Sequence, residues 1–302
     1  MRTAFSEALL ELAEHDPRIW LICGDLGFSV LERFAERFPA RFVNVGVAEQ
    51  NMTGLAAGLA LCGKVVFTYS IANFPVTRCL EQIRNDVCYH NLNVKIVAVG
   101  GGFAYGSAGY SHHAVELFAL MRSLPNMVVL APGDPVEARL ATQAAAAWSG
   151  PCFLQLGKAG EPIVHREPPP FEIGAAITLR DGSDVTLIGT GGALALTAKA
   201  ADELAQGGRS VQVLSMPTLQ PLDRAAIVRA AERTGRIVTV EEHGLGGLGS
   251  AVAETLAGWG RPVRFTPLRL TQTAVYRAAG QDALRAEQGI SIGGIIEAAS
   301  RD

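Results

Sequence analysis

Short apolar runs alternate with longer segments of mixed polarity along the first half of the chain. The runs predict strands, and the mixed segments predict helices with one apolar face. In the segment 2–14, Phe5, Leu9 and Leu12 fall on a single helical face. The predicted strands span 19–23, 41–45, 65–68, 94–99 and 127–130, and the longest predicted helices span 73–89 and 134–148. Wholly apolar strands separated by helices indicate a mostly parallel α/β sheet covered on both faces.

The pattern breaks at Glu167–Phe171, where consecutive prolines predict an irregular, exposed segment. The alternation then restarts, with predicted strands at 184–189, 211–214 and 236–240 and predicted helices at 192–206, 223–233 and 250–256. We therefore expect an α/β chain with two open, mostly parallel-sheet domains. They are residues 1–166 and a smaller domain at 183–302, joined by a linker at 167–182.

Composition narrows the class of protein. Of the 302 residues, 49% are hydrophobic and 18% are charged, which is typical of a well-packed globular chain. The net charge of −3 and the pI near 6.1 give no footprint for nucleic acid, and no apolar run reaches the length of a membrane span. The first residues turn acidic too early for a secretory signal. Five cysteines without a C-x-x-C pair predict reduced thiols, a cytoplasmic protein and no zinc site.

Glycine-rich loops mark candidate ligand sites. The loops at 189–192 and 244–249 lack the full dinucleotide fingerprint, so tight turns explain them as well. The loop at 100–109 is longer, follows a predicted strand and leads into Tyr110-Ser111-His112-His113. Loops at the carboxyl ends of parallel strands are where ligands bind, so we expect a site there. The chain contains no Walker pattern, which excludes a P-loop.

One carboxylate, Glu49, stands at the start of a helix that is almost free of charge, 51–60. A carboxylate beside such a helix is costly to bury unless something pairs with it. Two interpretations follow from the residues alone. Glu49 binds a ligand, or it is stabilised by the amide groups at the helix start.

Five stretches together resemble a known family. They are Cys23–Leu26, Gly46–Asn51, Arg78–Asn85, Ser111–Glu116 with Leu120–Met127, and Asp184–Gly191. In this order and at this spacing they are similar to the second half of transketolase, especially to the β subunits of split transketolases, whose two halves are separate polypeptides. The resemblance covers essentially the whole chain. It implies a pyrimidine-binding domain followed by a smaller transketolase C-terminal domain.

The resemblance assigns roles around thiamine diphosphate. It implies that Glu49 hydrogen-bonds N1′ of the aminopyrimidine ring, that Phe74 stacks on that ring, and that Ile71 stands where many relatives have a second aromatic. Asp25 matches an acidic residue near the cofactor, and His112 matches a histidine that faces the reacting carbon and could shuttle a proton. The alternatives are ordinary core for Phe74, a turn or helix cap for Asp25 and a solvated side chain for His112.

The chain lacks the Gly-Asp-Gly motif with a downstream Asn pair that anchors the diphosphate and its metal in this family. The resemblance therefore implies an N-terminal-half transketolase subunit as partner, in an α₂β₂ assembly. That partner would hold the Mg²⁺ or Ca²⁺, and the chain would be active only with it.

The substrate side departs from the family pattern. Gly100 and Ala108 stand where transketolases have His and Asp, and Gln155 replaces an arginine, which leaves Lys158 as the nearby cation. Tyr105 and Tyr110 could line a less polar pocket. We expect a small-molecule ketose or 2-oxo donor other than the usual phosphorylated ketose.

The predicted function is transfer of a ketol or acyl unit from this donor to an aldehyde acceptor. The alternatives are the β subunit of a 2-oxo acid dehydrogenase, a deoxyxylulose-phosphate-synthase-like enzyme, and a non-catalytic scaffold that kept the fold.

Overall fold

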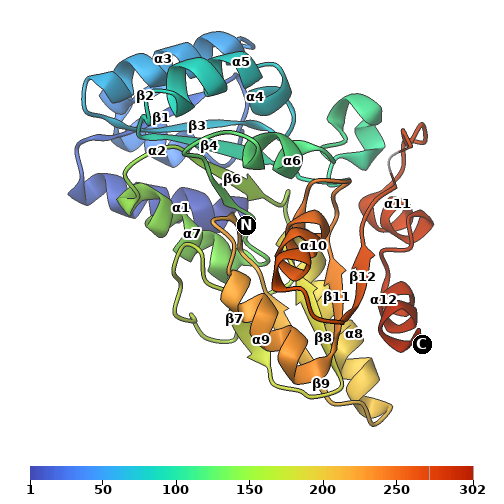
Figure 1. Cartoon of the computed structure of the whole chain (residues 1–302). Coiled ribbons are helices and arrows are strands. Elements are labelled where there is room, and N and C mark those ends of the chain that lie inside the picture. The colour runs from blue at the N-terminus through green and yellow to red at the C-terminus, as the bar shows by residue number, and fades with distance from the viewer. Residues whose placement is uncertain (272, 302) are drawn as a thin grey trace.

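The computed structural model describes residues 1–271 and 273–301, which form two α/β domains (Figure 1). The first sheet has the order β10-β5-β6-β4-β3-β1-β2, and the second has the order β12-β11-β8-β9-β7. All neighbouring strands are parallel except β10 on β5 and β7 on β9. The predicted architecture, two mostly parallel sheets with the smaller one second, is confirmed.

The first domain is built from elements between residues 2 and 156. Its strands are β1 (Ile19–Cys23), β2 (Phe42–Asn44), β3 (Val65–Ile71), β4 (Val94–Val99), β5 (Val128–Leu130) and β6 (Cys152–Leu156). Its helices are α1 (Arg2–His15), α2 (Glu32–Arg37), α3 (Glu49–Leu61), α4 (Phe74–Thr77), α5 (Leu80–Gln82), α6 (Leu117–Arg122) and α7 (Pro135–Ala147), with short turns η1 (Pro39–Arg41), η3 (Gly106–Ala108) and η4 (Tyr110–His112). Helices α3, α4 and α5 lie on one side of the sheet, and α1 and α7 lie on the other (Figure 1).

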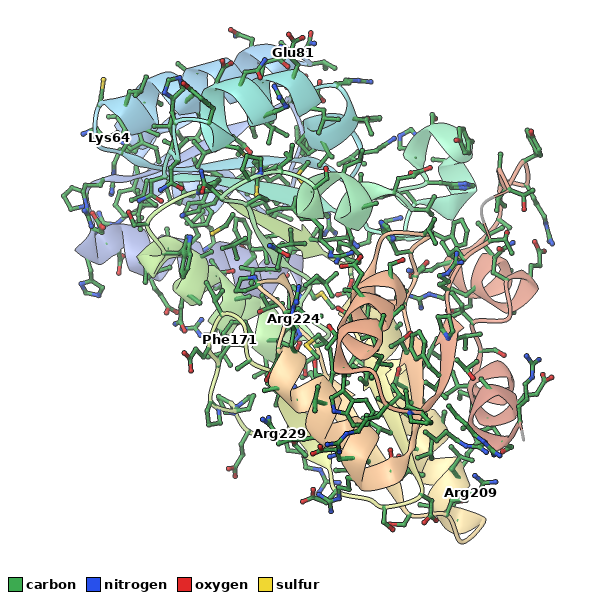
Figure 2. The ribbon with its side chains drawn as sticks, viewed as in Figure 1. Lys64, Glu81, Phe171, Arg209, Arg224 and Arg229 are labelled. Atoms are coloured by element: carbon green, nitrogen blue, oxygen red, sulfur yellow. The ribbon has the colours of Figure 1, made fainter. Side chains whose placement is uncertain are left out.

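The second domain follows the same plan. Its strands are β7 (Ile177–Arg180), β8 (Val185–Gly189), β9 (Val211–Ser215), β11 (Arg236–Val240) and β12 (Arg264–Leu268). Its helices are α8 (Leu194–Gln206), α9 (Arg224–Thr234), α10 (Leu248–Trp259), α11 (Gln281–Glu287) and α12 (Ile292–Ser300), preceded by the turn η5 (Gly191–Ala193). The two domains form opposite ends of the molecule, with Lys64 and Glu81 at one end and Arg209 at the other (Figure 2).

The predicted helix at 73–89 is not one regular helix. It consists of α4, α5 and a π-helical stretch, η2 (Ile83–Cys88). π-Helical insertions are frequent at functional sites. The first part of this segment carries Phe74 and Arg78, so the irregular backbone lies directly beside the candidate site.

Two antiparallel strands were not expected from the sequence. The segment predicted as a linker, 167–182, ends in β7, which pairs with β9 as an edge strand of the second sheet. Strand β10 (Thr218–Gln220) lies in the second half of the chain, yet it completes the first sheet by pairing with β5. The two domains are therefore interlocked through one sheet rather than joined only by a linker.

A buried polar network also crosses between the domains. The Glu137 carboxylate accepts hydrogen bonds from His165 Nε2 at 2.7 Å and from Ser215 Oγ at 2.6 Å. Asp134 caps α7 and accepts the backbone amide of His165 at 2.9 Å. Burial opposes a charge on His165, but the hydrogen bond and the negative charges of Glu137 and Asp134 outweigh it and raise the pKa of His165. The network therefore ties α7, the segment after β6 and strand β9 together.

A raised pKa in the folded state means that protonated His165 stabilises the fold. This contribution is complete below the unfolded-state pKa of about 6.5 and is lost as the pH rises through the folded-state pKa. In denaturant titrations, His165→Gln should lower the free energy of unfolding by about 1 kcal/mol at pH 6 and by less at pH 9. The exposed residue His90 supplies the control, His90→Gln. An equal loss for His165→Gln at both pH values would contradict the assignment.

Candidate active site

The candidate site lies where the parallel strands of the first sheet end. Gly24 follows β1, Glu49 begins α3 shortly after β2, Ser70 lies near the end of β3, and the glycine loop at 100–109 follows β4. In open α/β sheets ligands bind outside the carboxyl ends of the strands. The topology therefore brings these four positions to one edge.

Glu49 is 3% exposed, so its carboxylate is buried as the sequence predicted. Its Oε1 accepts a hydrogen bond from Ser70 Oγ at 3.3 Å, and its Oε2 accepts one from Arg78 Nη1 at 2.9 Å. Charge-assisted hydrogen bonds of this kind offset much of the cost of burying a carboxylate. Because its partners come from β3 and from the segment after α4, Glu49 is held by tertiary contacts and not by the helix start alone.

Arg78 also stacks on Phe74. Its guanidinium carbon lies 4.2 Å from the centre of the Phe74 ring. Arg78 thus places a flat, N–H-bearing group against an aromatic face while donating to a buried carboxylate. An aminopyrimidine would need the same two contacts. The Arg78 side chain is 47% exposed, so solvent reaches this stacked pair although the carboxylate behind it is buried.

His112 also contacts Phe74. The two rings are 5.2 Å apart in an edge-to-face arrangement. Ser111 Oγ lies 3.0 Å from His112 Nδ1, and Asn73 Nδ2 donates to the Ser111 carbonyl oxygen at 2.6 Å. The structure therefore brings Phe74 and His112 into contact, and Arg78 links Phe74 to Glu49.

Asp25 and Ile71 take less central places. Asp25 has a left-handed backbone with φ of 57°, and its carboxylate accepts a hydrogen bond from Asn44 Nδ2 at 3.0 Å. This geometry is that of the turn aspartate named as its alternative, although the side chain stays exposed at the site's edge of the sheet. Ile71 is the last residue of β3 and is half-buried.

The predicted substrate residues divide into two groups. The Tyr105 ring occupies the space into which a side chain at Gly100 would project, and Lys158 Nζ lies 4.8 Å from the centre of that ring. Gln155 and Lys158 line a cavity of about 410 Å³. Tyr110 lies apart from them, in a smaller cleft of about 130 Å³. Tyr105 is not among the residues that line this cleft, so the structure does not bring the two tyrosines together there.

Three contacts were not predicted from the sequence: those of Ser70 and Arg78 with Glu49, and that of Glu242 with the Phe103 amide of the glycine loop. Arg78 lies in one of the stretches that carry the resemblance, but its stacking on Phe74 depends on the rotamer. Glu242 belongs to Glu241-Glu242-His243, three polar residues directly after the buried strand β11. That position could have marked them for attention.

Other features of the described residues limit the site. Across residues 1–271 and 273–301, no group of three or more His, Cys, Asp or Glu side chains is arranged to hold a metal ion. Within the same residues, no helix has the length and apolar character needed to span a bilayer.

The buried Glu49 carboxylate and the Phe74 ring, linked through Arg78 at the carboxyl edge of a mostly parallel sheet, place a hydrogen-bonding group and a flat apolar face where α/β proteins bind ligands. Comparison with protein families agrees. Residues 1–160 match the pyrimidine-binding domain of transketolase, and residues 174–295 match the transketolase C-terminal domain. The chain belongs to the transketolase family, which confirms the resemblance seen in the sequence.

Two similar relatives are named as subunits of transketolases. The chain is 41% identical to one subunit of the apulose-4-phosphate transketolase of Phocaeicola vulgatus, over 87% of this chain and 86% of that one. It is 38% identical to the 6-deoxy-6-sulfo-D-fructose transketolase subunit SqwH of Clostridium sp. MSTE9, over 99% of this chain and 93% of that one. A solved structure described as a split gene transketolase, inactive β4 tetramer, is 39% identical with a TM-score of 0.89, over 99% of this chain and 96% of that one.

The contact between Arg78 and Glu49 can be tested by stability. Arg78→Ala leaves the buried carboxylate with Ser70 alone, so it should lower the free energy of unfolding near neutral pH by about 1 kcal/mol, a value reduced because Arg78 is half-exposed. Chemical denaturation measures the change. Arg84→Ala, which removes an exposed arginine of the same segment, is the control and should change little. An equal loss in both variants would contradict the pairing.

Proposed function

We propose that this chain is the β-type subunit of a thiamine-diphosphate-dependent transketolase, which moves a two-carbon ketol unit from a ketose donor to an aldehyde acceptor. The observation that carries the proposal is the pair of contacts made by Arg78, to the Glu49 carboxylate and to the Phe74 ring. They mark a slot for a flat ring with a hydrogen-bonding nitrogen. The names of both subunit relatives support the same activity.

The residues present fit thiamine diphosphate. When bound, the cofactor supplies the nucleophilic carbon and the electron sink for the transfer. Phe74 would hold the pyrimidine ring by stacking, and Glu49 would hold a proton on the ring nitrogen. His112, beside Phe74, would bind the oxygen of the reacting substrate and move a proton to or from it.

The partner subunit is part of the proposal. Helix α3 buries Met52, Ala56 and Ala57, whereas Val47, just before the helix, is 73% exposed and Leu61, the last residue of the helix, is 68% exposed. An exposed apolar surface beside a site is typical of a protein interface. We propose that an N-terminal-half subunit covers it in an α₂β₂ assembly and supplies the diphosphate anchor and its Mg²⁺ or Ca²⁺.

The alternatives have less support. The two transketolase subunits are 41% and 38% identical to the chain and are matched over most of their length. A 1-deoxy-D-xylulose-5-phosphate synthase of Desulfitobacterium hafniense is 36% identical but is matched over only 47% of its length, so the comparisons favour ketol transfer. A non-catalytic scaffold would not need the buried Glu49 carboxylate, which pairs with an arginine that stacks on Phe74. We also propose a cytoplasmic location, since all five cysteines are free thiols and four of them are buried.

Glu49→Gln tests the central claim. The amide cannot stabilise a proton on the pyrimidine ring nitrogen as a carboxylate does. Turnover by the complex with its N-terminal-half subunit should therefore fall by about 100-fold or more, and the absorbance change on thiamine diphosphate titration should be lost. Glu81→Gln makes the same chemical change on the exposed surface (Figure 2) and should keep wild-type turnover. Wild-type turnover in Glu49→Gln would refute the catalytic role.

We further propose that the donor differs from xylulose 5-phosphate and that Lys158 binds its anionic end. Tyr105 fills the place of the family histidine, and both named relatives act, by their names, on other anionic ketoses. Steady-state comparison of xylulose 5-phosphate, other phosphorylated or sulfonated ketoses and uncharged ketoses tests the donor. Highest kcat/KM with xylulose 5-phosphate would contradict the proposal.

Lys158→Met should raise the KM for a charged donor by about tenfold, the value of one charge-assisted hydrogen bond, and leave the KM for an uncharged ketose unchanged. Lys64→Met removes a lysine at the far end of the first domain and serves as the control (Figure 2). An equal effect of Lys158→Met on charged and uncharged donors would show that its charge is not used.

A further inference from the structure

The loop that carries His112 has a defined base. Gly102 and Ala114 exchange two backbone hydrogen bonds of 2.9 Å, which close the segment between them into a loop. Within this loop, the Ser111 carbonyl oxygen accepts a hydrogen bond from Asn73 Nδ2 of the first domain. The position of His112 over Phe74 therefore depends on what fixes the base.

The second domain fixes both sides of this base. The residues directly after β11, Glu241–Gly244, are called here the 241–244 segment. On one side of the base, the backbone amide of Phe103 donates to Glu242 Oε1 at 2.7 Å. On the other side, the amide of Gly244 donates to the Val115 carbonyl oxygen at 2.8 Å.

The Glu242 side chain packs closely against the backbone of Gly102 at the loop base. Its backbone is left-handed, with φ of 62°, and a Cβ built there would overlap the Glu242 side chain. A glycine at this position therefore permits the approach of Glu242 to the loop.

His243 extends the contact beyond the loop. Its Nε2 accepts a hydrogen bond from the Phe118 amide at 2.9 Å, and its ring stacks on the Phe118 ring at 4.8 Å. Burial lowers the pKa of His243 to about 4, so the ring is neutral near pH 7 and can accept this bond. The 241–244 segment thus contacts the base of the loop and the start of α6 together.

Glu242 is itself held in one orientation. Its Oε2 accepts hydrogen bonds from Arg285 Nε at 2.8 Å, Arg285 Nη2 at 2.5 Å and Gln281 Nε2 at 2.9 Å. The side chains of Glu242 and Arg285 are both buried. A buried pair with several fixed bonds specifies direction more than it adds stability.

We propose that Glu242, supported by Arg285 and joined by His243 and Gly244, positions His112 for ketol transfer, so that the second domain sets the geometry of a site in the first. The proposal rests on the proposed function for the meaning of His112. Glu242 acts here through the Phe103 amide and the loop base, which makes it a positioning residue.

Glu242→Gln and Glu241→Gln form a matched pair for the test. Glu241 is buried too and also accepts backbone amides, but these belong to Leu248 and Gly249 at the start of α10, within the second domain. The change in chemistry is the same, and only Glu242 contacts the loop that carries His112.

Hydrogen–deuterium exchange of the segment 103–116 is measured on the full chain without partner or cofactor. Glu242→Gln should speed exchange there by about tenfold, and Glu241→Gln should leave it at the wild-type rate. In the complex with the N-terminal-half subunit, Glu242→Gln should lower kcat by about ten- to a hundredfold with little change in donor KM or in thiamine diphosphate affinity. Glu241→Gln should keep the wild-type kcat.

Unchanged exchange in a folded Glu242→Gln chain overturns the positioning role, and so does faster exchange with wild-type kcat. If Glu242→Gln does not fold, Arg285→Lys keeps the charge but cannot make both bonds to Glu242. Arg285→Lys should then also speed exchange of the segment 103–116 and lower kcat, both by less than Glu242→Gln is expected to. If neither change is seen, the proposal is overturned. A wild-type complex without transketolase activity overturns the proposed function instead, whatever exchange is observed.

Discussion

The burial of the Glu49 carboxylate is the constraint on which the rest of the site depends. A charged group at the edge of an apolar sheet is tolerated only with partners, and the fold supplies Ser70 from β3 and Arg78 from the segment after α4. Arg78 in turn is oriented by the Phe74 ring. The need to pair the buried Glu49 carboxylate therefore orients Ser70 and Arg78, and Arg78 packs on Phe74. These side chains form the candidate binding surface.

The same principle operates between the domains. Glu137 is satisfied by His165 and Ser215, and Glu242 by Arg285 and by the Phe103 amide. In both cases a carboxylate buried at a domain contact takes donors from the two sides. Such contacts are costly when one partner is displaced, so they fix the relative orientation of the domains more strictly than apolar packing would.

The sequence predicted the parts of the fold that local pattern controls. Strands such as β4 and β8 were found at their places because they are buried on both faces and mostly apolar, a signal that does not depend on alternation along the strand. Strands β7 and β10 were not predicted, because they are short antiparallel edge strands whose pairing is set by residues distant in the sequence. Glu49, Phe74 and His112 were grouped through the resemblance to transketolase, because their own local patterns left ordinary structural roles open. The stacking of Arg78 and the reach of Glu242 depend on rotamers and domain packing, which no local pattern encodes.

The pairing of β10 with β5 has a consequence for synthesis on the ribosome. The first sheet is complete only when residues 218–220 have left the ribosome, long after the rest of its strands. Until then β5 is an unpaired sheet edge, which is a template for unwanted pairing with other chains. The two domains have separate sheets, but they cannot be completed independently during synthesis. The first sheet is finished only after much of the second domain has been synthesised.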